Sequence, residues 1–181
     1  MDEDFPLHTR ISKHPRTKRK HGNITWRKPP RGTFKLNFDG STISNNDSAA
    51  GAVIRDWEGH PIHICYKKLG KQNPLKAEAL ALKLGIQKAL QLRINKLHIE
   101  GDSMIIINHL NKTSTCPWEI ELILSDVKFL LSTLKEVSFF HVSRLGNRVT
   151  DKVAHLCHSA GGVDINNDSG LLDLIRKDAI G

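Results

Sequence analysis

The fold of this 181-residue chain is decided by the stretch Lys35-Leu36-Asn37-Phe38-Asp39-Gly40-Ser41. Together with Phe34, its apolar residues alternate with polar ones, and this period of two indicates a strand with one apolar face. The strand ends at Asp39, which is followed by glycine, and Asp-Gly is a common turn signal. We therefore predict a first strand that ends at an acid, and a loop over the polar residues 40–48.

Two more strands and a long helix are predicted downstream of this loop. Residues 51–57 and 61–69 fit strands, with Glu58-Gly59 as the turn between them. The period then changes to that of a helix opened by Asn73-Pro74. The apolar residues of this helix are Leu75, Ala79, Leu82, Ile86 and Leu90. Three strands on short connections form an antiparallel meander.

The remaining elements alternate between strand and helix. Strands are predicted at 96–100 and 137–142, and helices at 103–110, 119–134 and 147–159, the last capped by Asn147. Ile105-Ile106-Ile107 would also fit a strand. The element order is βββαβααβα, and strands joined by helical crossovers must be parallel. The sequence therefore predicts an α/β fold with a five-stranded mixed sheet flanked by helices.

Most of the positive charge precedes this domain. The chain has a net charge of +8, and its first 31 residues hold nine Lys or Arg against three acids. We predict a disordered basic arm over 1–31, a folded domain over 32–160 and a tail over 161–181 that contains one short helical turn. The densest basic stretch, Arg16–Lys20, fits a solubilising tail, a nucleic-acid contact or a nuclear localisation signal. Nucleus and cytoplasm therefore both stay open as locations.

Composition excludes several other classes of protein. The three cysteines form no CxxC pair and no even set, which argues against a zinc site or a disulfide framework and favours a reducing compartment. The chain opens with Met-Asp-Glu-Asp rather than a secretion signal, and it has no run of about 18 apolar residues that could span a membrane. No GxGxxG turn follows the first strand, which excludes a Rossmann-type nucleotide binder. We expect an intracellular monomer.

Four acids lie at positions where an acid can either stabilise local structure or belong to a functional site. Asp39 can start a turn, Glu78 in the first turn of its helix can stabilise the helix dipole, and Asp102 can cap the next helix. Asp151 fits a solvated position on the last helix, opposite an apolar stripe of Val149, Val153 and Leu156. On the functional side, Glu78 is flanked by small alanines, and Asp102 follows a strand end, where sites in α/β sheets lie.

The segments around these acids form an ordered set of short motifs. They are Trp26–Pro30, Lys35–Ser41, Gly51–Asp56 with Gly59, Ala77–Leu82, Glu100–Ser103, His141–Arg144, Gly146–Arg148 and Asp151–Ala154. In this order, and without large gaps from Trp26 to Ser159, they resemble type 1 ribonuclease H domains. The strongest resemblance is to the plant, retroelement-related reverse-transcriptase-like branch.

This resemblance implies a ribonuclease H-like fold with a metal centre. The strands of Asp39 and Asp102 would be adjacent and parallel, and helices would bring Glu78 and Asp151 to the same edge. Four crowded acids repel one another unless a polyvalent cation binds. Oxygen ligands favour two Mg²⁺ ions, with Mn²⁺ as a substitute.

The implied activity is endonucleolytic hydrolysis of the RNA strand of RNA–DNA hybrids by two metals about 4 Å apart. Asp39 would bridge both metals, Glu78 and Asp102 would ligate the one on the leaving-group side, and Asp151 the one that activates water. RNA would be distinguished from DNA through its 2′-hydroxyls, with Glu78 and the loop at 41–46 as candidate contacts.

Two departures from the family pattern leave an alternative open. Many type 1 enzymes carry a histidine in the loop before the fourth acid, but residues 144–147 contain none. His141 lies within the strand pattern, and His155, one turn past the fourth acid, could substitute. A basic handle is also missing, since 111–118 contains only Lys112. The alternative is an inactive module that only binds nucleic acid or protein. Because all four acids are retained, we predict an active enzyme.

Overall fold

The computed structural model describes residues 27–44 and 47–159. The predicted tail, and all of the predicted arm except residues 27–31, lie outside this part of the chain. Among the helices of the described part, none combines the length and the apolar character needed to cross a membrane.

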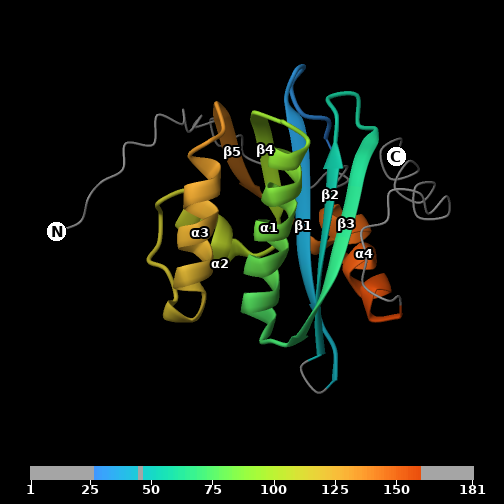
Figure 1. Cartoon of the computed structure of the whole chain (residues 1–181), viewed down its shortest axis with the longest axis vertical. Coiled ribbons are helices and arrows are strands. Elements are labelled where there is room, and N and C mark those ends of the chain that lie inside the picture. The colour runs from blue at the N-terminus through green and yellow to red at the C-terminus, as the bar shows by residue number, and fades with distance from the viewer. Residues whose placement is uncertain (1–26, 45–46, 160–181) are drawn as a thin grey trace.

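Five strands form one mixed sheet in the order β3-β2-β1-β4-β5. They are β1 (Phe34–Thr42), β2 (Asp47–Arg55), β3 (Pro61–Lys71), β4 (Lys96–Gly101) and β5 (Glu136–His141). The first three strands pair antiparallel, as their short connections allow, whereas β4 and β5 run parallel to β1 (Figure 1). The predicted five-stranded mixed sheet is confirmed.

Helices cover both faces of the sheet. They are α1 (Pro74–Gln91), α2 (Met104–Leu110), α3 (Glu121–Leu131) and α4 (Arg148–Ser159), with 3₁₀ turns η2 (Trp118–Ile120) and η3 (Arg144–Asn147). α1 packs on one face with α3 beside it, and α4 lies on the opposite face against β1, β2 and β3 (Figure 1). Ile105–Ile107 are helical, which decides between helix and strand there.

The two faces have separate apolar cores. On the α1 face, Leu36 and Phe38 of β1 join one large cluster with the buried side of α1. On the other face, α4 packs Val149, Val153 and Cys157 against β2 and β3. The predicted stripe of α4 is therefore wrong at Leu156, which is 44% exposed. Positions 149, 153 and 157 share one face because residues four apart lie above one another on a helix.

The prediction of a loop over 40–48 is wrong. β1 continues to Thr42 and β2 begins at Asp47, with Thr42 opposite Ser48 in the ladder. Ser41 is buried, and Thr42 Oγ1 lies 2.9 Å from Ser48 Oγ. Small polar residues carry no strand signal of their own, so pairing with the neighbouring strand decides their structure. Ser41 and Thr42 are therefore strand residues rather than members of a substrate-binding loop.

The polar side of β1 is buried as well. Lys35 Nζ donates to Glu100 Oε1 on β4 at 2.6 Å, and Asn37 Nδ2 donates to Glu100 Oε2 at 3.2 Å. Because β4 lies directly beside β1, with Asn37 opposite Glu100, these side chains find partners across the two strands. We call Lys35, Asn37 and Glu100 the paired cluster.

Two glycines of the central strands allow helices to approach closely. A Cβ atom on Gly40 would lie 2.4 Å from the backbone nitrogen of Glu78 in α1. A Cβ atom on Gly51 would lie 2.7 Å from the backbone nitrogen of Ala154 in α4. Gly51 is opposite Asp39 in the β1–β2 ladder. α1 and α4 therefore both come close to the sheet beside Asp39, one on each face.

Candidate metal centre

Asp39 lies in β1 with its side chain almost completely buried. Asn147, at the end of η3, donates from Nδ2 to the carbonyl oxygen of Phe38 at 2.9 Å and to Asp39 Oδ1 at 3.4 Å. Asn147 Oδ1 has no hydrogen-bond partner within the described residues, so its side chain does not cap the last helix as predicted. Asn147 instead holds the backbone and the carboxylate of β1. Sequence reasoning missed this role because an Asn before a helix is also an ordinary capping signal.

Glu78 comes from α1. This helix starts at Pro74 behind an Asn73 cap, whose side chain accepts a hydrogen bond from the backbone N–H of Lys76, and its first turn contains no acid. The interpretation of Glu78 as a first-turn, dipole-stabilising residue is therefore wrong. Its carboxylate accepts a hydrogen bond from the backbone of Gly40, while Oε2 is buried with no hydrogen-bond partner in the described part of the chain. A buried acceptor without a donor is consistent with a cation ligand.

Asp102 directly follows β4. Ser103, rather than Asp102, is the N-cap residue of α2, and it makes no side-chain capping bond. The backbone carbonyl of Asp102 accepts a hydrogen bond from His141 Nε2 at 3.0 Å, which gives this histidine a structural role. The carboxylate is left to face other charged groups, with Oδ2 at 3.4 Å from Arg144 Nε.

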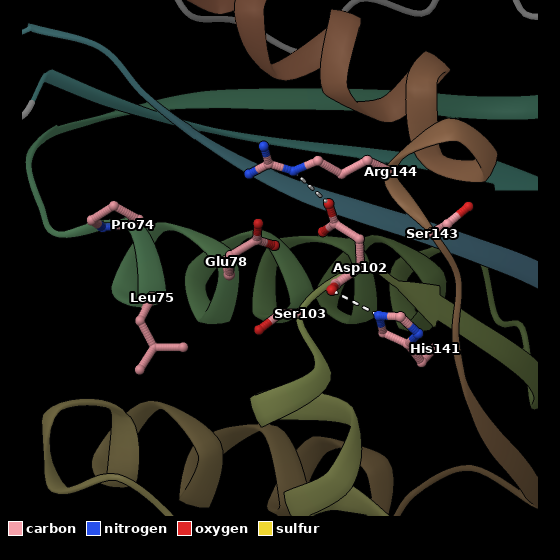
Figure 2. Close-up of a pocket in the computed structure, with 8 residues that line it drawn as sticks. All are labelled: Pro74, Leu75, Glu78, Asp102, Ser103, His141, Ser143 and Arg144. Carbon is pink, nitrogen blue, oxygen red and sulfur yellow. Dashed lines mark hydrogen bonds and ion pairs between the residues drawn. The ribbon is translucent and has the colours of Figure 1, made fainter.

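These three acids converge. Asp39, Glu78 and Asp102 each offer a carboxylate oxygen, and the three oxygens lie within 4.8 Å of one another. We call them the acidic cluster. An open pocket of about 450 Å³ exposes two of them, Glu78 and Asp102; its other lining residues are Pro74, Leu75, Ser103, His141, Ser143 and Arg144. Figure 2 shows the carboxylates of Glu78 and Asp102 turned toward the same space in this pocket.

The acidic cluster is electrostatically frustrated. Burial, together with the charges of Asp102 and Asp151, raises the pKa of Asp39 to about 8. Burial, together with the charges of Asp39 and Asp102, raises the pKa of Glu78 to about 9. With no metal ion bound, burial and mutual repulsion therefore favour the protonated forms of Asp39 and Glu78.

Asp151 is near the acidic cluster but not part of it. Its side chain is 55% exposed on α4, and Oδ1 lies 3.6 Å from His155 Nδ1. Its charge still raises the pKa of Asp39, which shows that the two carboxylates interact. The structure thus brings together three of the four predicted acids and leaves the fourth at the solvent side.

The donor set suits a hard divalent cation. It consists of carboxylate oxygens only, and Mg²⁺ and Mn²⁺ prefer such ligands over the nitrogen and sulfur atoms that select zinc. A divalent ion would neutralise the like charges that now raise the pKa values of Asp39 and Glu78. It would also give Glu78 Oε2 a partner.

Comparison with known proteins identifies the family. A model of the reverse transcriptase-like family matches residues 37–157, which include all four acids. A putative ribonuclease H protein of Arabidopsis thaliana is 26% identical over 163 residues, which cover 87% of this chain. The matched region spans only 26% of that relative's length.

Solved structures share the fold. Ribonuclease H1 of the archaeon Halobacterium salinarum superposes with a TM-score of 0.67 at 21% identity, over 70% of this chain and 98% of that one. The N-terminal RNase H domain of a Mycobacterium tuberculosis protein gives 0.65 at 17% identity, over 68% and 96%. LC11-RNase H1, from compost, solved with an RNA/DNA hybrid, gives 0.64 at 17% identity, over 68% and 95%. The chain therefore belongs to the reverse transcriptase-like family and contains a ribonuclease H-like domain.

Proposed function

We propose that this chain is a metal-dependent endonuclease that hydrolyses the RNA strand of RNA–DNA hybrids. The observation that carries the proposal is the acidic cluster: one buried and two partly buried carboxylates within 4.8 Å of one another, beside the carboxyl end of β4. Such a cluster destabilises the fold unless it serves to bind a cation. One of the structural neighbours, LC11-RNase H1, was solved with an RNA/DNA hybrid, which supports this substrate class.

The four acids would hold two Mg²⁺ ions, with Mn²⁺ as a substitute. Asp39 would be shared by both ions, since its carboxylate interacts with both Asp102 and Asp151. Glu78 and Asp102 would hold one ion, and the solvent-exposed Asp151 the other. Bound there, the two ions would supply an activated water and neutralise charge on the scissile phosphate and its leaving oxygen.

The protein's own groups prepare this site. Asn147 fixes Asp39 by hydrogen bonds to its carboxylate and to the backbone before it. His141 holds the strand end at Asp102 through the backbone carbonyl. Asp151 and His155 lie next to each other at the exposed side, where water has access. Choice of RNA would rest on contacts to 2′-hydroxyl groups, for which Glu78 at the pocket and residues 43–44 after β1 stay candidates within the described residues.

A cleavage assay tests the proposal. Labelled RNA–DNA hybrid, RNA duplex and DNA duplex are each incubated with and without Mg²⁺. We expect cleavage of the RNA strand of the hybrid only, dependent on Mg²⁺, with 5′-phosphate and 3′-hydroxyl ends. Binding of the hybrid without cleavage would favour the inactive, nucleic-acid-binding module, and cleavage of the DNA duplex would indicate another class of nuclease.

A further inference from the structure

Arg144 occupies an unusual place at the mouth of the pocket. It opens η3, the short turn between β5 and α4, and its side chain is 93% exposed, whereas its partner Asp102 is only 11% exposed. Nε lies 3.4 Å from Asp102 Oδ2. Figure 2 shows the side chain extended across the pocket, with the guanidinium beyond Asp102 in the direction of Glu78. A cation on a solvent-exposed side chain therefore lies against the more deeply placed acids of the cluster.

Arg144 acts on the whole acidic cluster. Its charge lowers the pKa of Asp39 and that of Glu78, in opposition to burial and to the neighbouring carboxylates. Arg148, four residues further on and also exposed, is not among the groups that shift either pKa. The position of Arg144, rather than general positive charge in this segment, provides the compensation.

The contact between Arg144 and Asp102 is easy to break. Because the guanidinium is exposed, water hydrates it readily when it leaves Asp102, so an ion pair with such an exposed member contributes little net stability. A divalent cation at the same carboxylates would repel the guanidinium, so both cannot be bound there at full strength. A guanidinium released at this position remains at the pocket, and its planar pair of N–H donors matches two oxygens of a phosphate.

Resting on the proposed function, we propose that Arg144 is an exchangeable counter-ion. It neutralises the acidic cluster in the metal-free protein, leaves Asp102 when a divalent cation binds, and then contacts a phosphate of the nucleic acid. This role predicts opposite effects on two ligands: removal of Arg144 strengthens metal binding and weakens nucleic-acid binding. A residue that merely supports the fold would weaken both.

The first test measures metal affinity without nucleic acid. Mn²⁺ is titrated by calorimetry into the wild-type protein, Arg144→Ala, Arg144→Lys and the matched control Arg148→Ala. We expect Arg144→Ala to bind Mn²⁺ about tenfold more tightly, the size expected for one charge acting on a divalent ion across a water-like medium. Arg144→Lys and Arg148→Ala should bind within about twofold of the wild-type protein.

The second test measures affinity for a fluorescent RNA–DNA hybrid by anisotropy, once with Ca²⁺ in place of Mg²⁺ and once in EDTA. Arg144→Ala should lose about fivefold to tenfold in affinity with Ca²⁺ and less than about twofold in EDTA, because only the metal-loaded protein frees the guanidinium. With Ca²⁺, the affinity of Arg144→Lys for the hybrid should lie between those of the wild-type protein and Arg144→Ala. Gel electrophoresis checks that the hybrid stays intact during the measurement.

Equal Mn²⁺ affinity in Arg144→Ala and Arg148→Ala would overturn the inference, as would an equal loss of hybrid affinity with and without Ca²⁺. These results differ from a failure of the proposed function. In that case the wild-type protein itself would bind no Mn²⁺ or would leave the hybrid uncut.

Discussion

The paired cluster lies on β1 and β4, and two acids of the acidic cluster, Asp39 and Asp102, follow it two residues further along the chain. The two clusters differ in how their charge is compensated. In the paired cluster, Glu100 of β4 accepts hydrogen bonds from Lys35 and Asn37 of β1. Burial lowers the pKa of Lys35, and the Glu100 carboxylate opposes that shift. One step further along both strands, Asp39 and Asp102 put like charges together.

The difference separates a structural use of buried charge from a functional one. In a buried ion pair with satisfied hydrogen bonds, each charge has its partner within the protein. A buried group of like charges is electrostatically compensated only when a ligand of opposite charge binds to it. Neighbouring positions of the fold therefore hold one buried charge that is paired within the chain and one group of like charges that needs a cation from solution.

The largest effect should come from single charge removals in the acidic cluster. Asp39→Asn, Glu78→Gln and Asp102→Asn should each abolish hybrid cleavage, because each removes a metal ligand, while thermal stability in EDTA stays the same or rises as repulsion is relieved. Asp151→Asn should be milder, since that carboxylate stands at the solvent side. Initial rates and melting curves measure both effects. The matched control is Asp126→Asn, an exposed acid on α3 that is paired with Lys83.

A fully active Asp102→Asn protein would be enough to discard the metal site and the contrast between the two clusters.

In the paired cluster, removal of a charge should lower the stability of the fold and leave metal binding unchanged, the reverse of the effect expected in the acidic cluster. Glu100→Gln leaves the ammonium of Lys35 buried beside a neutral group, which should destabilise the fold by about 3 kcal/mol, as for other broken buried ion pairs. Mn²⁺ affinity should stay unchanged, because Glu100 is not one of the clustered ligands. Glu136→Gln, which breaks the exposed pair with Lys96, serves as control and should cost at most about 1 kcal/mol in urea unfolding. A Glu100→Gln protein as stable as this control would contradict the contrast.

The pH dependence of stability should reveal the acidic cluster without any substrate. Asp39 and Glu78 have ordinary pKa values of 3.8 and 4.5, and their folded-state values are about 8 and about 9. The folded state binds protons more tightly than the unfolded state, so this contribution to stability is complete below about pH 4 and is lost as the pH rises toward 8 to 9. Melting in EDTA should therefore show a decline from about pH 5 to pH 8.

Glu78→Gln should flatten this decline, because it removes one of the two titrating groups, and saturating Mg²⁺ should do the same in the wild-type protein. A decline of unchanged slope in Glu78→Gln would indicate that other groups cause it.

The smallest effect on the folded domain should come from the basic arm. We propose that the arm is an affinity tether, because it carries nine of the chain's basic residues, whereas the segment 111–118 that could form a basic handle holds only Lys112. Deletion of residues 1–24 keeps Arg27, whose backbone carbonyl accepts a hydrogen bond from Lys35 in the paired cluster. Melting temperature and cleavage at saturating hybrid should hardly change.

Deletion of residues 1–24 should instead weaken binding of the hybrid and reduce the dependence of its affinity on salt. If about four charges of the arm engage phosphates, the slope of log affinity against log salt should flatten by roughly 3 to 4 units, at about 0.9 per phosphate. An unchanged slope would leave the arm as a targeting segment, with Arg16–Lys20 as the candidate nuclear signal.

The sequence by itself determined the order of elements and the identity of the candidate acids. Alternation in β1 and helical spacing in α1 are local signals, because each apolar face is defined by residues within one segment. The motifs around the four acids indicated the family in the same way, and the family model matches residues 37–157, a range that includes all four acids. None of this required knowledge of long-range contacts.

Only the tertiary structure decided what the polar residues do. β1 extends to Thr42 because β2 pairs with it, and Lys35 is buried because β4 lies beside it. Asn147 reaches Asp39 across 108 positions of sequence, and Arg144 meets Asp102 only because β4 and β5 are neighbours. A polar side chain has no preferred face of its own; its partner, its charge state and its exposure follow from which strands and helices the fold places around it.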